Sequence, residues 1–294
     1  MQISANGISL EVEDHGSPSG EPLLLIMGLG MQLVAWHADL VASLVARGYR
    51  VIRFDNRDIG LSQRFDHLGA PNLAVDLLKH AVGMKVSAPY TMADMADDAA
   101  GLLDALGIPA AHICGASMGG MIAQQLAVRH PERVKSLTLI MTSSGSRSLP
   151  GPTLKVRSAM ISRPQDPKDV NSVVDHYVKL YRLIGSPGFP AAEDDLKERL
   201  GRSIRRSYRP QGTARQMVAI AADGNRSQLL ELITVPTQVI HGNQDPLVPA
   251  AAGIDLAARI PGAQIDLIEG MGHDLPVQLW PRFVAGIGGV AGRA

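Results

Sequence analysis

The chain has 294 residues, and its 28 Lys and Arg side chains balance 28 Asp and Glu side chains, so the formal net charge is zero. This balance argues against a nucleic-acid-binding surface, which would require a clustered excess of basic residues. The single cysteine, Cys114, excludes an internal disulfide and a metal site built from cysteine thiolates.

The first residues of the chain contain neither a basic stretch nor an apolar stretch, so no signal peptide is expected. No apolar run reaches the roughly 20 residues that a membrane-spanning helix requires. The sequence therefore predicts a cytoplasmic protein with no membrane span and no nucleic-acid partner.

Strand and helix patterns alternate along most of the chain. Apolar runs and period-two alternation predict strands, the first of them a half-exposed edge strand, at residues 8–13, 23–27, 51–54, a short run ending at 114, 134–141, 236–240 and 264–268. Helical periodicity and capping residues predict helices at 40–47, 72–82, 91–106, 121–130, 173–184, 192–207, 214–222, 250–259 and 277–290. This alternation indicates an α/β fold with a mostly parallel central sheet flanked by helices.

Two segments depart from the alternation. Residues 64–90 form a long irregular segment with one short predicted helix, and segments of this length are usually functional or mobile. From about residue 154 to 226 the strand pattern disappears and only helical stretches remain. One of these helices is basic, which fits either a solvated helix face or a selector for acidic substrates. Its basic residues are Lys197, Arg199, Arg202, Arg205 and Arg206.

A G-x-S-x-G motif, from Gly115 to Gly119, joins a short strand to a helix. A serine at the tip of such a turn has a strained backbone, and its hydroxyl projects above the edge of the sheet. The helix N-terminus supplies main-chain N–H groups that suit a developing oxyanion. The alternative is that five small residues occur together in a glycine-rich chain, but the strand–turn–helix context favours Ser117 as a nucleophile.

Three further features follow predicted strands, so we expect them at the same carboxyl edge of the sheet. They are Gly28-Leu29-Gly30, Asp245 and His273. A serine hydroxyl needs a base, which histidine supplies, and the histidine needs a carboxylate that orients its ring. The sequence therefore predicts a catalytic triad of Ser117, Asp245 and His273.

Rival residues exist for two of these functions. His241 also ends a strand, but it shares a loop with the predicted acid, and we expect it to shape that turn. Asp55 ends another strand and is the second candidate for the acid. Asp274 adjoins His273 and cannot easily face it, and His112 lies at the wrong end of its strand.

These motifs resemble those of serine esterases with the α/β-hydrolase fold. The nucleophile turn, the acid loop and the histidine loop of that family correspond to Gly115-Ala116-Ser117-Met118-Gly119-Gly120, residues 241–249 and Gly272-His273. Within the family, residues 27–30 and 54–62 are most similar to bacterial esterases of the aclacinomycin-methylesterase type.

The chain departs from many members of this family by having Met27-Gly28 where they have His-Gly. The family's oxyanion donor is a main-chain N–H, so Leu29, with Met118, is still expected to form the oxyanion hole. The segment 64–90 is longer than usual, and its use as a second lid is an open alternative.

The resemblance implies a core formed by residues 1–145 and 226–294, with a helical lid at 146–225 inserted after the sixth strand. It implies hydrolysis of a small-molecule carboxylic ester with no cofactor and no metal. A pocket lined by Gly28, Met31, Trp36 and Met118 is expected beneath the lid.

Other uses of the same site stay open. The triad also suits hydrolysis of C–C bonds or lactones, and perhydrolysis through a serine perester. A different class of protein, a ligand-binding receptor with very slow turnover, could keep the same residues.

Overall fold

A computed structural model describes residues 1–294. Its strands, in chain order, are β1 (Gln2–Ala5), β2 (Ile8–His15), β3 (Glu21–Ile26), β4 (Tyr49–Phe54), β5 (Ala111–Ala116), β6 (Val134–Ile140), β7 (Thr237–Gly242) and β8 (Gln264–Ile268). They form one sheet in the order β1-β2-β4-β3-β5-β6-β7-β8. Strands β3 to β8 are parallel, and β2 is antiparallel to both β1 and β4.

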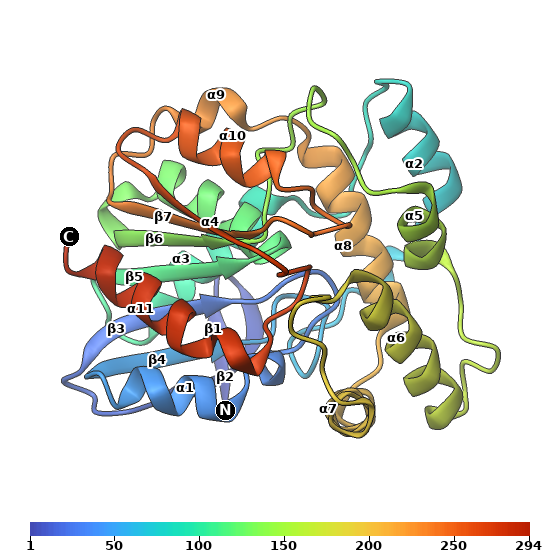
Figure 1. The fold of residues 1–294 in the computed structure, drawn as a ribbon, viewed down its shortest axis with the longest axis horizontal. Coiled ribbons are helices and arrows are strands. Elements are labelled where there is room, and N and C mark those ends of the chain that lie inside the picture. Colours follow the sequence, from blue (N-terminus) through green and yellow to red (C-terminus); the bar gives the residue numbers. More distant parts are fainter.

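Helices cover both faces of this sheet (Figure 1). On one face lie α3 (Met92–Ala105), α4 (Met118–Arg129) and α10 (Ala251–Arg259), and on the other lie α1 (Ala38–Val45) and α11 (Trp280–Ala291). Strand β3 contributes Leu24 and Ile26 to the first core and Leu23 and Leu25 to the second. Because both faces of the sheet are buried here, residues 23–26 of β3 are all apolar.

The edge of the sheet differs from the prediction. Residues 8–13 were expected to form an edge strand, and this is wrong because β2 lies between β1 and β4. The chain reverses at Asn6 and Gly7, which both have positive φ, 49° and 74°. An Asn-Gly pair is the strongest short signal of a two-residue hairpin, so the sequence contained the evidence for β1.

Helices fill the stretch between β6 and β7. They are α5 (Leu154–Ile161), α6 (Val170–Ile184), α7 (Glu193–Arg206), α8 (Pro210–Asp223) and the short α9 (Ser227–Leu230). Helices α6 and α7 share a small core of Val174, Val178, Leu196 and Leu200. Helices α6, α7 and α8 lie beyond the carboxyl ends of the parallel strands, and we call α5 to α8 the cap helices (Figure 1).

The segment 64–90 contains η2 (Asp66–Leu68) and α2 (Leu73–Ala81), which packs beside α8. Apolar side chains of this segment are exposed, including Leu78 and Val82. Every helix in the structure is too short or too polar to cross a lipid bilayer.

The two ends of the cap meet at one place, which we call the clasp. The Arg226 main-chain N–H donates to the Ser144 oxygen at 2.8 Å, and its guanidinium donates to the Ser143 oxygen at 2.8 Å. A Cβ on Gly145, whose φ is +74°, would lie 2.1 Å from the Gly224 oxygen. The chain therefore leaves and re-enters the sheet between two neighbouring strands, β6 and β7.

Candidate active site

Ser117 occupies the turn between β5 and α4 with a positive φ of 54°. The glycines around it are required by close backbone contacts. A Cβ on Gly115 would lie 2.3 Å from the Gly119 oxygen, and a Cβ on Gly119 would lie 2.1 Å from the Ile26 oxygen. The predicted strand–turn–helix is therefore present, and it leaves Ser117 partly exposed at the carboxyl edge of the sheet.

The structure brings the three residues of the predicted triad into one hydrogen-bonded line. His273 Nε2 lies 3.0 Å from Ser117 Oγ, and His273 Nδ1 lies 2.7 Å from Asp245 Oδ2. Asp245 and His273 are buried, with 5% and 7% of their surfaces exposed. This geometry suits a base that takes a proton from the serine and an acid that holds the imidazole ring in place.

The loop after β7 fixes the Asp245 carboxylate. Its Oδ1 atom accepts main-chain N–H groups from Leu247 at 2.9 Å and from Val248 at 2.8 Å. Oδ2 is left to face the histidine ring. The loop thus gives each carboxylate oxygen a separate partner, which sets the orientation of the acid.

The rival histidines lie in other environments. His241 Nε2 lies 2.7 Å from the Val248 main-chain oxygen, and burial lowers its pKa. His112 Nδ1 lies 2.8 Å from Ser136 Oγ. Both rings therefore make local contacts within the sheet and its loops.

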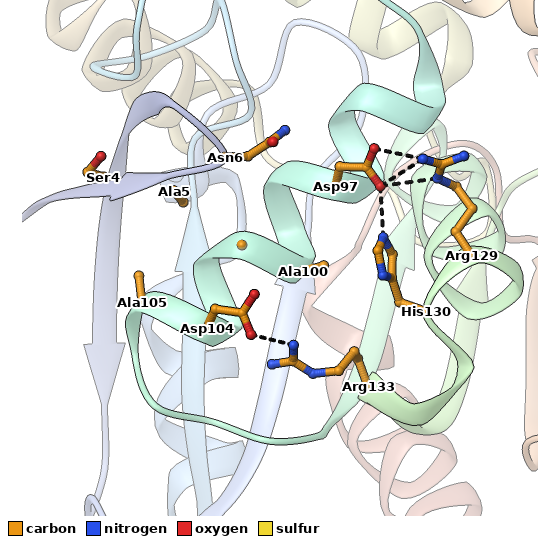
Figure 2. A pocket seen from close by; sticks show the side chains of 11 residues that line it. Ser4, Ala5, Asn6, Asp97, Ala100, Asp104, Ala105, Arg129, His130 and Arg133 are labelled. Atoms are coloured by element: carbon orange, nitrogen blue, oxygen red, sulfur yellow. Dashed lines mark hydrogen bonds and ion pairs between the residues drawn. The ribbon is translucent and has the colours of Figure 1, made fainter.

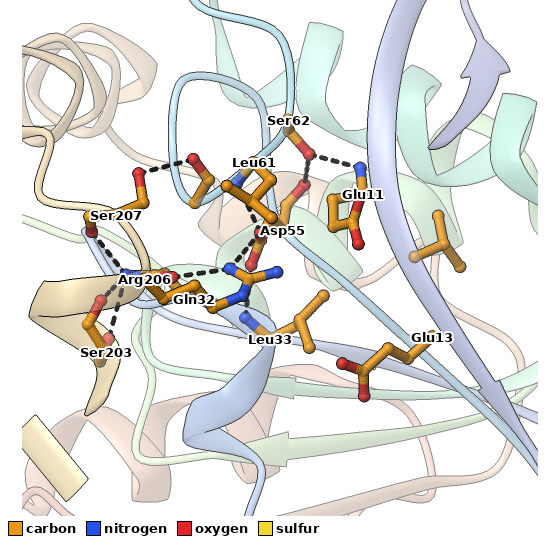
Figure 3. Close-up of polar contacts among 12 residues, drawn as sticks. Glu11, Glu13, Gln32, Leu33, Asp55, Leu61, Ser62, Ser203, Arg206 and Ser207 are labelled. Carbon is orange, nitrogen blue, oxygen red and sulfur yellow. Dashed lines mark hydrogen bonds and ion pairs between the residues drawn. The ribbon is translucent and has the colours of Figure 1, made fainter. Parts of the chain in front are cut away.

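Asp55, the second candidate for the acid, organises loops instead (Figure 3). Its Oδ1 accepts the Leu33 N–H at 2.7 Å, and its Oδ2 accepts the Leu61 N–H at 2.8 Å. Arg206 from α7 donates to the same Oδ2 at 2.7 Å. Burial nevertheless raises the pKa of Asp55 above its usual value.

The predicted oxyanion donors flank Ser117. Met118 is the first residue of α4, where main-chain N–H groups have no partner within the helix. Leu29 follows β3, beside Gly28, where a Cβ would lie 3.0 Å from Ser117 Cβ. Asn56 Nδ2 donates to the Met27 oxygen at 2.9 Å and so supports the loop that carries Leu29.

Two residues predicted to line a pocket differ in position. Met31 reaches the cap, because its Sδ accepts the Tyr181 hydroxyl of α6 at 2.8 Å. Trp36 is only 1% exposed and packs in the core with residues of α1. Trp36 therefore packs in the core, and its contribution to a substrate pocket stays a prediction.

The histidine loop rests on the end of α6. The His273 N–H donates to the Ile184 oxygen at 2.7 Å, and the Gly272 N–H donates to Ser186 Oγ at 2.9 Å. The Ser186 hydroxyl donates in turn to Asp274, whose pKa is raised by burial. Ser186 and Asn56 were not predicted as residues of the site. Asn56 is a polar residue just after a strand, which is a usable signal, whereas no pattern in the sequence marks Ser186.

Two of the five basic residues of helix α7 pair with acids of the same helix. Lys197 contacts Glu193 and Arg202 contacts Glu198, each at 2.8 Å and each four residues away. Arg206 alone turns inward, to Asp55. These contacts favour the solvated-face interpretation over a selector for acidic substrates.

An open depression lies on another part of the surface, between the β1–β2 turn, α3 and α4 (Figure 2). Its charges are paired with one another. Arg129 and His130 contact Asp97, and Arg133 contacts Asp104. The depression therefore offers no free charge to a ligand.

Comparisons with known proteins agree with this architecture. Residues 21–278 match the family described as "alpha/beta hydrolase fold". Rhodomycin D methylesterases from Streptomyces sp. (strain C5) and Streptomyces peucetius are each 30% identical, over 97% of this chain and 95% of their own length. A 2-hydroxymuconate semialdehyde hydrolase from Pseudomonas sp. (strain CF600) is 30% identical over 98% of this chain and 92% of its own.

A solved structure, the meta-cleavage product hydrolase from Pseudomonas fluorescens IP01, shares the fold. It superposes with a TM-score of 0.76 at 21% identity, covering 100% of this chain and 97% of that one. The predicted fold class and the predicted resemblance to bacterial methylesterases are confirmed. The chain belongs to the alpha/beta hydrolase family.

Proposed function

We propose that this hydrolase cleaves carboxylic esters of small molecules, with Ser117 as nucleophile, His273 as base and Asp245 as the acid that orients the histidine. The observation that carries the proposal is the pair of contacts from His273, 3.0 Å to Ser117 Oγ and 2.7 Å to Asp245 Oδ2. The similarity to methylesterases over nearly the whole chain supports an ester as the substrate.

The reaction would proceed through an acyl-enzyme. His273 takes the Ser117 proton as Oγ attacks the ester carbonyl, and then passes that proton to the leaving alkoxide. Water attacks the acyl-enzyme in the second half, with His273 again as base. Asp245 stabilises the imidazolium that forms in each half.

The negative charge of each tetrahedral intermediate needs donors in fixed positions. We assign this function to the main-chain N–H groups of Leu29 and Met118. The loss of one such donor typically lowers kcat by about 10²- to 10³-fold. We assign residues 146–225 as the cap over this site, with Gly28 and Met31 at its base.

The first test is hydrolysis of p-nitrophenyl esters of graded acyl length by the wild type and by Ser117→Ala. We expect saturable turnover in the wild type and a loss of about 10⁴-fold or more in the variant, since the nucleophile is absent. Circular dichroism and thermal melting would show that the variant is folded. Turnover near the wild-type rate in Ser117→Ala would refute the assignment.

C–C bond hydrolysis is a second candidate, favoured by the 30% identity to a 2-hydroxymuconate semialdehyde hydrolase. A vinylogous 1,5-diketone substrate separates the two reactions when it is compared with the ester series. The third alternative, a ligand-binding receptor with slow turnover, would be labelled stoichiometrically at Ser117 by a fluorophosphonate. Its turnover number would stay below one per hour with every substrate tried.

A further inference from the structure

We propose that the cap helices hold the oxyanion loop in its working shape, and that Gln216 on α8 is the positioning residue for the Leu29 N–H. Three consecutive residues after Leu29 each contact a different cap helix. The Gly30 N–H donates to Gln216 Oε1 at 2.9 Å, and the Tyr181 hydroxyl of α6 donates to Met31 Sδ at 2.8 Å. Gln32 Nε2 donates to the main-chain oxygens of Ser203 and Ser207, both at 2.7 Å, beside α7 (Figure 3). This inference rests on the proposed function of Leu29.

Gln216 is fully buried, and both ends of its amide are used. Its Oε1 accepts the Gly30 N–H, and its Nε2 donates to the Arg57 main-chain oxygen at 3.0 Å. In the reversed orientation, the amide nitrogen would face the Gly30 N–H and the amide oxygen would face the Arg57 oxygen, so neither hydrogen bond could form. The side chain is therefore held in one orientation, and it joins the loop after β3 to the loop after β4.

The peptide group that carries the Leu29 N–H lies between two anchored peptide groups. On its N-terminal side, Asn56 holds the Met27 oxygen at 2.9 Å. On its C-terminal side, Gln216 holds the Gly30 N–H. With both neighbours fixed, the intervening peptide has little freedom to rotate, so the direction of the Leu29 N–H is set before substrate arrives.

Helix α8 also touches the loop directly. Gly30 has a φ of +68°, and a Cβ there would lie 2.9 Å from the Thr213 side chain. The helix is independently attached to the core, because the buried Arg215 guanidinium contacts both oxygens of Asp58, at 2.5 and 2.8 Å. A substitution at Gln216 should therefore leave α8 in place and act on the loop.

The test compares Gln216→Leu with wild type in ester hydrolysis and in affinity for an aryl boronic acid, which forms a tetrahedral adduct with the serine. We expect kcat to fall by about 10- to 100-fold, less than the ~10²- to 10³-fold of losing a donor outright. KM and the affinity for the carboxylate product should change by less than about threefold, while the boronic acid binds more weakly by the same factor as kcat/KM. Gln216→Glu, which keeps the acceptor for Gly30, should recover part of the rate.

Gln125→Leu is the matched control. Gln125 Nε2 donates to Asp223 Oδ1 at 3.0 Å, so this buried glutamine holds the other end of α8 without contacting the oxyanion loop. We expect a comparable fall in Tm with wild-type kcat and boronic acid affinity. An equal fall of kcat in both glutamine variants, or wild-type kcat in folded Gln216→Leu, would overturn the inference.

Fluorophosphonate labelling separates this inference from the proposed function. Gln216→Met, which also lacks the amide oxygen that accepts the Gly30 N–H, provides the same comparison if Gln216→Leu does not fold. Labelling passes through an anionic transition state that the same donors stabilise. Slower labelling of the Gln216 variant supports the positioning function even if ester turnover is undetectable. Equal labelling rates would overturn it, and a wild type that is neither labelled nor active would overturn the proposed function as well.

Discussion

His241 lies near the end of β7 and His273 follows the neighbouring β8, yet only His273 is placed to exchange protons with Ser117. His273 sits between Ser117 and Asp245, whereas His241 packs under α10, where a Cβ on Gly253 would lie 2.6 Å from its Nδ1. That Nδ1 atom is buried without a hydrogen-bond partner. Burial therefore favours the neutral form of His241 and lowers its pKa.

His241 should make stability depend on pH. Its pKa is lower in the folded chain than the ~6.5 of an unfolded histidine, so the unfolded chain binds the proton first as the pH falls. The contribution of neutral His241 to the free energy of unfolding is complete above about pH 6.5. It is lost as the pH falls from there towards the pKa of His241 in the folded chain. We expect Tm to fall less in His241→Gln than in wild type between about pH 7.5 and about pH 5.5. Differential scanning calorimetry at both pH values measures this, and equal slopes would contradict it.

The proximity of Ser117, Asp245 and His273 could be predicted from sequence because each lies in a turn or loop after a strand, and the carboxyl ends of parallel strands lie at one edge of the sheet. Gln216 and Ser186 could not be predicted in this way. Both lie in the cap, where the contacts depend on how helices pack against distant loops. No local pattern identifies a buried glutamine that bridges two loops 186 and 159 residues away in the chain.

At the scale of elements, α4 crosses the end of β3 in close main-chain contact near the site. Gly119 lets the helix approach the Ile26 main-chain oxygen, and Gly120 lets it approach Thr142 after β6. The nucleophile turn and the oxyanion loop are thereby held against each other by main-chain contact.

Gly119→Ala should disturb both the nucleophile turn and the oxyanion loop. Its Cβ would lie 2.1 Å from the Ile26 oxygen, which cannot move without shifting β3. We expect a loss of about 3 kcal/mol or more, at the upper end of overpacking, together with loss of ester turnover. Gly289→Ala in α11 is the control, because nothing lies within 4 Å of that Cβ, and a gain of up to about 1 kcal/mol is expected. Urea unfolding of both variants gives the comparison, and a neutral Gly119→Ala would refute the argument.

Most helices and strands could be predicted because their periodicity was clear. The capped helix at 91–106 corresponds to α3, where Thr91 and Asp94 form the expected capping box. The helix α5 was not predicted, because most of its residues are exposed or half-buried and apolar residues do not follow one face. Secondary structure without a buried face leaves no pattern in the sequence.

At the scale of the whole molecule, a buried ion pair connects the N-terminal hairpin, the loop after β4 and α3. Arg57 contacts both oxygens of Asp98, at 2.6 and 2.7 Å, and Asn6 donates to Asp98 Oδ1 at 2.9 Å. The guanidinium also lies over the rings of Phe65 and Tyr90, at 5.4 and 5.3 Å. Three segments far apart in the chain are therefore held at one point.

Removal of one partner should be costly, because it leaves an uncompensated charge in the interior. We expect Asp98→Ala to lower the free energy of unfolding by about 3–5 kcal/mol. The neighbouring Asp97→Ala, which breaks a more exposed pair with Arg129, should cost about 1 kcal/mol or less. Equilibrium unfolding in urea measures both free energies. Similar decreases in the two variants would show that the buried ion pair stabilises the fold no more than the exposed one.

The clasp between Ser144 and Arg226 has a consequence for how such enzymes diversify. Because the cap leaves and returns at one point, a cap of another length or shape could replace it by recombination without disturbing the order of the strands. The core would keep the nucleophile, base and acid, and the new cap would bring a new substrate range. If Gln216 has the positioning function proposed above, the incoming cap must also carry a side chain that accepts the Gly30 N–H. A change of substrate range and a change of catalytic rate would then be linked.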